Sequence, residues 1–317
     1  MRRVEILSRF FLAFAATVLM FFSGVALPAA GLVLVPFVPQ PALTFGLKYG
    51  IGWGLGVLGL AMVILNILAG EEVAVIYGTF ALMTGLLFGM LGRVRAIESI
   101  VFGVAAAASA YSGGLMFYFF GSWSATMSQF RESLTHQFSS ALSVREKMGF
   151  SQDGSDLIKE RLPQIIDMML QILPAIVFLS LAFVILINLV FLCRRFPERR
   201  EQWLRVENLR EWKGPESTVW ALIACGFALF IPGLEFVQVI AVNVLLIVAA
   251  CYFAQGLAVV AYFFHKNNVP RFLRGLTYLL IVFQQIFTLL VTGLGLFDLW
   301  GDFRRLDKKH LTPSQAA

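Results

Sequence analysis

Long apolar runs separated by short charged loops recur along this 317-residue chain, and one run is unusually rich in glycine. Within residues 42–68, Gly46, Gly50 and Gly54 recur at four-residue spacing, with further glycines between them. Glycine weakens a helix in water. In lipid, small residues let neighbouring helices approach closely, and close packing drives their association. The pattern predicts a membrane protein built from tightly packed helices.

The composition agrees with a chain that lies mostly in lipid. Hydrophobic residues make up 59%, charged residues 14%, and the mean hydropathy is +0.80. A soluble domain has about 45–50% apolar and about 25% charged residues. The predicted fold class is therefore all-α, a polytopic transmembrane helical bundle with eight or nine membrane segments, one of them short or re-entrant. The predicted segments are residues 6–26, 28–38, 42–68, 73–91, 99–120, 165–192, 218–231, 236–264 and 276–300.

Four parts follow from this pattern. Residues 1–121 form N-terminal transmembrane helices. Residues 122–164 form a polar extracytoplasmic segment, which is either an amphipathic helix or a solvated connector. Residues 165–306 form C-terminal transmembrane helices and include a basic loop at 193–217. Residues 307–317 are predicted to be a disordered tail.

The basic loop sets the expected orientation, because Lys and Arg in short loops favour the cytoplasmic side. The N-terminal arginines share that side if residues 28–38 cross the membrane. Arg304 and Arg305 then lie on the opposite side unless one late segment is re-entrant. Residues 218–231, at about 14 residues, are short for a ~30 Å core and are the first candidate. The expected location is the bacterial inner membrane, as a multi-pass protein.

Polar residues inside the predicted spans are candidates for a ligand site, because polar groups are costly in lipid. Lys48 either neutralises an anionic ligand at the bundle centre or extends its long side chain to the interface. Gln284 and Thr288 share one face of the last span, and Asn243 and Gln255 come from the span before it. These uncharged groups either line a pocket for a neutral, hydrogen-bonding small molecule or hold neighbouring helices together.

Small residues predict two close helix contacts. The first face is Gly46, Gly50 and Gly54, and the second is Ala106, Ala110 and Gly114. Small residues four apart let another helix approach, and that helix belongs either to this protein or to another one.

The chain lacks the motifs of the common enzyme classes: it has no HExxH, GxSxG, P-loop or CxxC. Its three histidines, His136, His265 and His310, are far apart. We therefore expect no enzyme, no metal and no cofactor. Acidic residues interspersed in the basic loop dilute its positive field, so no nucleic-acid partner is expected.

The C-terminal third carries motifs that resemble a known family. They are Asn243-Val-Leu-Leu, Gln255-Gly-Leu-Ala-Val-Val, Pro270-Arg-Phe-Leu-Arg and the run from Gly295 to Arg305. In these motifs the chain is similar to the YybS-like family of uncharacterised multispanning bacterial membrane proteins. The resemblance implies a distant similarity to the substrate-binding subunits of energy-coupling-factor vitamin transporters and to MreD. It assigns no role to the shared acids and arginines, for which the physical expectation is a charge pair at a helix end. These residues are Asp298, Asp302, Arg304 and Arg305.

Two functions remain open at this point. The first is a small-molecule transport component, resembling the substrate-binding subunit of a vitamin transporter. The second is a non-transporting membrane organiser, similar to MreD, that recruits other membrane proteins. A polar pocket enclosed by Asn243, Gln255 and Gln284 favours the first function. A solid bundle with an exposed glycine face favours the second. The expected partners are the lipid bilayer, other membrane proteins and, for the first function, a neutral small-molecule ligand.

Overall fold

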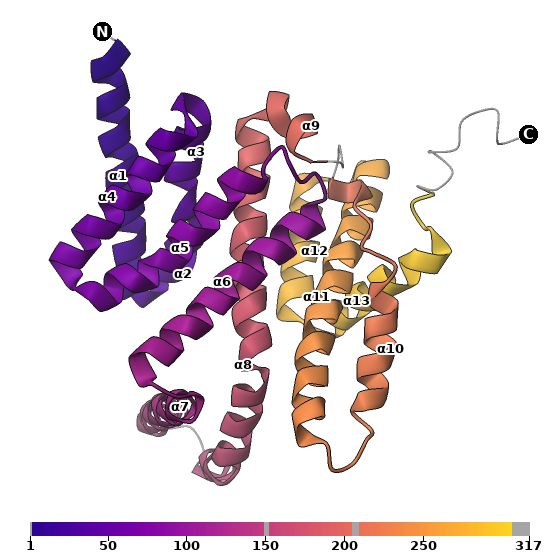
Figure 1. Cartoon of the computed structure of the whole chain (residues 1–317). Helices are drawn as coiled ribbons and strands as arrows, with labels where there is room; N and C mark the ends of the chain where they lie inside the picture. Colours follow the sequence, from indigo (N-terminus) through magenta and orange to yellow (C-terminus); the bar gives the residue numbers. More distant parts are fainter. Residues whose placement is uncertain (1, 149–151, 205–208, 306–317) are drawn as a thin grey trace, which may run out of the picture. The chain divides into compact units, whose positions relative to one another are not determined.

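The computed structural model describes residues 2–148, 152–204 and 209–305 (Figure 1). The described residues form helices and no β-strand, which confirms the predicted all-α class. The predicted tail, residues 307–317, lies outside the described residues. In chain order the helices are α1 (Arg2–Ala26), α2 (Pro28–Leu34), η1 (Val35–Phe37), α3 (Pro39–Tyr49), α4 (Ile51–Ala69), α5 (Glu71–Met90), α6 (Ile97–Phe120), α7 (Trp123–Lys147), α8 (Gln152–Arg195), η2 (Pro197–Arg199), α9 (Arg200–Trp203), η3 (Leu209–Glu211), α10 (Thr218–Ala228), α11 (Glu235–Lys266), α12 (Arg271–Phe283) and α13 (Gln285–Gly301).

Seven helical stretches in the described residues are long and apolar enough to cross a membrane, and the bent pair α12–α13 is either a broken eighth span or a re-entrant segment. A span needs about 20 residues because each residue advances a helix by about 1.5 Å. Residues 28–38, which were predicted as a separate short segment, belong to a full-length candidate span, Ala29–Tyr49. This supports the topology in which the N-terminus lies on the same side as the end of α3.

The glycine-rich run does not form the single span predicted for residues 42–68, because the helix breaks at Gly50. This residue has φ 121° and ψ 140°, a conformation that residues with a Cβ rarely adopt. The four-residue spacing was interpreted as one helical face, but it also suits a turn between two packed helices. Gly46 and Gly54 face each other across that turn, and a Cβ on Gly46 would lie 3.0 Å from the Gly54 Cα. The ring of Phe88 packs against both.

Replacing Gly50 by alanine distinguishes a continuous helix from a turn. In a continuous helix, alanine would stabilise the protein by about 1 kcal/mol. At this positive φ, we expect Gly50→Ala to destabilise it by about 1–3 kcal/mol. The measurement is the thermal unfolding midpoint in detergent. The matched control is Gly52→Ala, whose added Cβ would meet nothing within 4 Å. Equal midpoints for the two variants would contradict the turn.

The chain divides into two compact units. The first comprises Met1–Val94 and Ser99–Arg199, and the second comprises Arg95–Glu98 and Arg200–Ala317. The boundary at Arg199 lies inside the predicted basic loop, and helices α7 and α8 belong with the N-terminal helices. The first unit has a hydrophobic core in which α1, α3, α4 and α5 bury their apolar side chains. Members of this core are Phe21, Phe45, Val57, Leu65 and Tyr77.

The polar segment predicted at residues 122–164 is mostly helical. Leu134, Phe138 and Leu142 are at least partly buried at four-residue spacing on α7, the helix that packs against α8. An ion pair between Arg131 and Asp167 also joins the two helices. Helix α7 thus has a partly buried apolar face, although Val144 and Met148 are exposed. Helix α8 is 44 residues long and begins well before the span predicted at residue 165.

In the second unit, the last predicted span is bent. Helices α12 and α13 meet at an angle of 101°, with Gln284 between them. Helix α10 starts at the basic loop and α11 packs along it, so α12 begins on the side of the loop. After α13, Arg304 donates hydrogen bonds to the carbonyls of Arg210 and Trp212 in that loop. The chain therefore turns back within α12–α13 rather than at residues 218–231. The C-terminal arginines consequently lie on the side of the basic loop, in agreement with the positive-inside rule.

Candidate functional site

A buried charge pair lies at the carboxyl end of α13. Arg304 Nη2 donates to Asp298 Oδ2 at 2.6 Å, and the two side chains are 0% and 2% exposed. Asp302, which ends α13, has a left-handed backbone with φ 36°, a conformation that Asp tolerates better than most residues. The chain then reverses, so that Arg304 reaches a carboxylate six residues earlier. Taking two charges out of water costs several kcal/mol each, so such a pair requires further hydrogen bonds.

Those hydrogen bonds connect the pair to α11 and to the basic loop. The Gln255 amide, itself fully buried, donates from Nε2 to Asp298 Oδ2 at 3.1 Å. Arg304 Nη1 donates to the carbonyls of Arg210 at 2.7 Å and Trp212 at 2.9 Å. The loop is also a donor, because the Gly214 N–H donates to Gln255 Oε1 at 3.1 Å. We call Gln255, Asp298 and Arg304 the loop-binding network, since together they bind three backbone groups of one loop.

Two glycines bring α11 and α13 into backbone contact beside this network. A Cβ on Gly256 would overlap the carbonyl of Val291, and a Cβ on Gly295 would overlap the carbonyl of Tyr252. Gly256 adjoins Gln255 in the sequence, and Gly295 precedes Asp298 by one helical turn. The contact therefore sets the distance across which the glutamine reaches the aspartate.

The other polar residues predicted to bind a ligand lie outside the network. Asn243 Nδ2 donates to the Val239 carbonyl of its own helix at 2.8 Å. Thr288 Oγ1 donates to the Ile281 carbonyl at 2.6 Å, across the bend. Gln284 is exposed at the bend itself. None of the three forms a hydrogen bond with Gln255 in the part of the chain that the structure describes. A ligand-binding role for these residues stays a prediction.

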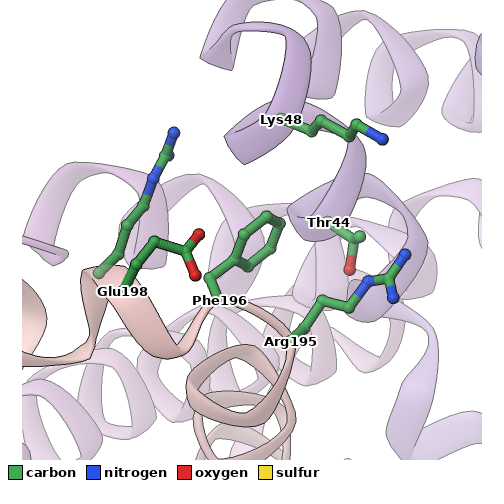
Figure 2. A pocket seen from close by; sticks show the side chains of 6 residues that line it. Thr44, Lys48, Arg195, Phe196 and Glu198 are labelled. Atoms are coloured by element: carbon green, nitrogen blue, oxygen red, sulfur yellow. The ribbon is translucent and has the colours of Figure 1, made fainter.

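Lys48 lies in the first unit, at a helix end. Because Gly50 stops the helix, Lys48 falls in the last turn of α3, and its side chain is exposed. Its Nζ lies 5.3 Å from the centroid of the Tyr49 ring. It lines an open cavity of about 370 Å³ (Figure 2). The other lining residues are Thr44 on α3, Arg195 at the end of α8, and Phe196, Glu198 and Arg199 beyond it.

The two small-residue faces differ in burial. Gly46 and Gly54 are buried, whereas Gly50 is exposed in the turn. On α6, Ala110 and Gly114 are exposed and Ala106 is partly buried. The buried face of α6 is a different one, formed by Ile100, Val104, Ala105 and Ala108. A helix contact through the predicted α6 face stays a prediction.

These features define the class of protein. The chain is an α-helical, multi-pass membrane protein with a buried ion pair, Asp298–Arg304, after its helix α13. Within the described ranges, no group of three or more His, Cys, Asp or Glu residues is placed to hold a metal ion.

Comparison with known families makes the assignment specific. The chain matches, over residues 15–299, the family described as "Predicted membrane protein (DUF2232)", and it belongs to that family. Searches of curated proteins and of solved structures gave no significant match.

Proposed function

We propose that this protein is a non-transporting membrane organiser that presents residues 210–214 of its basic loop, in one fixed conformation, to protein partners. The observation that supports the proposal is that both ends of the Gln255 side-chain amide form hydrogen bonds within the protein. Its amide oxygen accepts the Gly214 N–H, and its amide nitrogen donates to Asp298. A side chain engaged at both ends within the protein is poorly suited to binding a small molecule. It is well suited to holding a loop.

The cost of the buried charges supports the same function. A buried ion pair contributes little net stability, because desolvation offsets most of the attraction. We infer that the loop-binding network is kept because it selects one conformation of residues 210–214. A loop whose backbone is already ordered loses less conformational entropy when a partner binds, so its affinity rises without new contacts.

The finer assignments belong to this proposal. The YybS-like resemblance and its distant similarity to MreD agree with an organiser. The bacterial inner membrane is the expected location, with the basic loop in the cytoplasm. A transport component is the second candidate. The bend at Gln284 favours it, because broken helices at membrane depth are where transporters commonly bind substrates.

The fixed loop is tested first by proteolysis of the full-length protein. Gln255→Leu removes the acceptor of the Gly214 N–H and one of the donors to Asp298. Leaving such buried groups unsatisfied destabilises the folded loop by about 1–3 kcal/mol. Because protease sensitivity follows the population of the open form, we expect tryptic cleavage after Arg210 and Lys213 to become about 10-fold faster. The matched control is Gln238→Leu, a glutamine in the first turn of α11 that donates to carbonyls of the α10–α11 connection. Equal cleavage of both variants would argue against a loop held by Gln255.

Partner binding is tested next, by native mass spectrometry of protein extracted gently from its own membrane. The organiser predicts a stoichiometric protein partner that is lost in Gln255→Leu and retained in Gln238→Leu. The transport proposal predicts a co-purifying small molecule that is lost in both Gln255→Leu and Gln284→Leu. That second result, with no protein partner, would replace the organiser by the transport component.

A further inference from the structure

The cavity between the ends of α3 and α8 has an excess of positive charge. Its lining includes three cations, Lys48, Arg195 and Arg199, and one carboxylate, that of Glu198. Figure 2 shows Lys48 and Thr44 on the last turns of α3, facing Arg195 from the end of α8. The Thr44 hydroxyl adds a neutral hydrogen-bond donor beside the cations.

One of the three cations is engaged in holding the two helix ends together. Arg199 Nη1 donates to the Leu47 carbonyl at 3.0 Å, and its guanidinium lies 5.7 Å from the centroid of the Phe196 ring. Lys48 and Arg195 are exposed and form no ion pair with any residue that the structure describes. Two positive charges are therefore available to a ligand. Arg199 holds the end of α3 against the segment that follows α8.

We propose that this cavity binds a phosphate-bearing anion through Lys48, Arg195 and Thr44. Charge-assisted hydrogen bonds from Lys and Arg to phosphate oxygens are among the strong ones. A volume of about 370 Å³ is within the range of small-molecule sites. The proposal does not depend on the loop-binding network, because Gln255, Asp298 and Arg304 do not line this cavity.

The position of the cavity indicates two sources for this anion. Candidate spans end at Tyr49 and at Arg195, so the cavity lies at the depth of lipid headgroups. Basic pockets between helices on the cytoplasmic side bind the headgroups of acidic phospholipids. The same cations are open to the aqueous phase, where a free phosphate has the same charge and the same oxygens. The shared chemistry is a phosphate group, and experiment separates its sources.

Glu198 allows a test in which substitutions at one cavity change the affinity for the anion in opposite directions. Its carboxylate lines the same cavity and repels an anion. Neutralising it with Glu198→Gln should strengthen binding, whereas neutralising Lys48 or Arg195 should weaken it. A nonspecific loss of fold would not produce effects of opposite sign.

The first experiment titrates phosphatidylglycerol into the full-length protein in neutral detergent micelles and counts bound lipids by native mass spectrometry. Loss of one cation near a headgroup weakens binding about 5-fold, so Lys48→Gln/Arg195→Gln should bind about 25-fold more weakly. The matched control removes two exposed arginines outside the cavity, Arg93→Gln/Arg95→Gln, and should bind as the wild type does. Equal weakening of both double variants would show general attraction to acidic lipid and overturn the site.

The second experiment adds inorganic phosphate to lipid-free micelles and follows the thermal unfolding midpoint. A rise that is lost in Lys48→Gln/Arg195→Gln assigns the cavity to a free anion. No rise with phosphate, together with site-dependent binding of phosphatidylglycerol, assigns it to a lipid headgroup. If neither probe distinguishes the double variant from the wild type, the proposal is wrong. The midpoint of each variant without added anion confirms that it is folded.

Discussion

Replacing Arg304 by methionine should destabilise the second unit by about 3–5 kcal/mol, because it leaves the buried Asp298 carboxylate without its countercharge. The two loop carbonyls that Arg304 binds lose their donor as well. The free energy of unfolding, measured by denaturant titration in mixed micelles, reports this loss. Arg305→Met is the matched control, because Arg305 is the next residue and is exposed. We expect that control to remain within about 0.5 kcal/mol of the wild type.

A double variant separates the charge pair from the loop contacts. In Asp298→Leu/Arg304→Met no buried charge is left unpaired, so its cost should be smaller than the sum of the two single variants. The remaining cost measures what the two loop carbonyls and the Gln255 amide lose. Strict additivity, or an Arg304→Met variant as stable as Arg305→Met, would contradict a buried pair.

The second large effect is expected at the contact between α11 and α13. Gly295→Ala places a Cβ on the Tyr252 carbonyl, and a backbone group cannot move aside as a side chain does. The helices must separate, so we expect a cost of about 3 kcal/mol, at the upper end for overpacking. Gly293→Ala is the matched control on the same helix, since its Cβ would meet nothing within 4 Å. The measurement is the thermal unfolding midpoint, which should be lower for Gly295→Ala than for Gly293→Ala. Equal midpoints would argue against this contact.

The same contact predicts a particular failure of additivity. Gly256→Ala overlaps the Val291 carbonyl on the opposite helix. One separation of α11 from α13 relieves both overlaps, so the double variant Gly256→Ala/Gly295→Ala should cost less than the sum of the single variants. It should also expose the basic loop to trypsin, because Gln255 then no longer reaches Asp298.

Apolar run length and charge deficit predicted the helical class and most of the spans, because the bilayer permits few alternatives. The same evidence could not locate the breaks. At Gly50, a glycine ladder within one helix and a glycine turn between two helices have the same spacing. At Gln284, the bend interrupts a run that is apolar on both sides, and no proline or glycine adjoins it. Lys48 was therefore expected either at the bundle centre or with its side chain reaching the interface, and it lies in the last turn of α3.

The candidate site was partly visible in the sequence. Asp298 and Arg304 are close together in the chain, and a charge pair at a helix end was expected. Their other partners are backbone carbonyls of a loop 94 residues earlier, and a carbonyl has no residue-specific signature. The pairing of Gly256 with Gly295 was equally hidden, because two single glycines on different helices form no repeat.

The 94-residue separation between Arg304 and the Arg210 carbonyl has a consequence for biosynthesis. The ribosome makes the basic loop first, and its backbone acceptors remain open to water while α10, α11, α12 and α13 are synthesised and inserted. The last helix then brings the arginine that closes it. The hydrogen bonds from Arg304 to the loop therefore form only after α13 has been made. In a chain arrested before α13 the loop lacks these bonds, and we expect proteases to cleave it faster than in the complete protein.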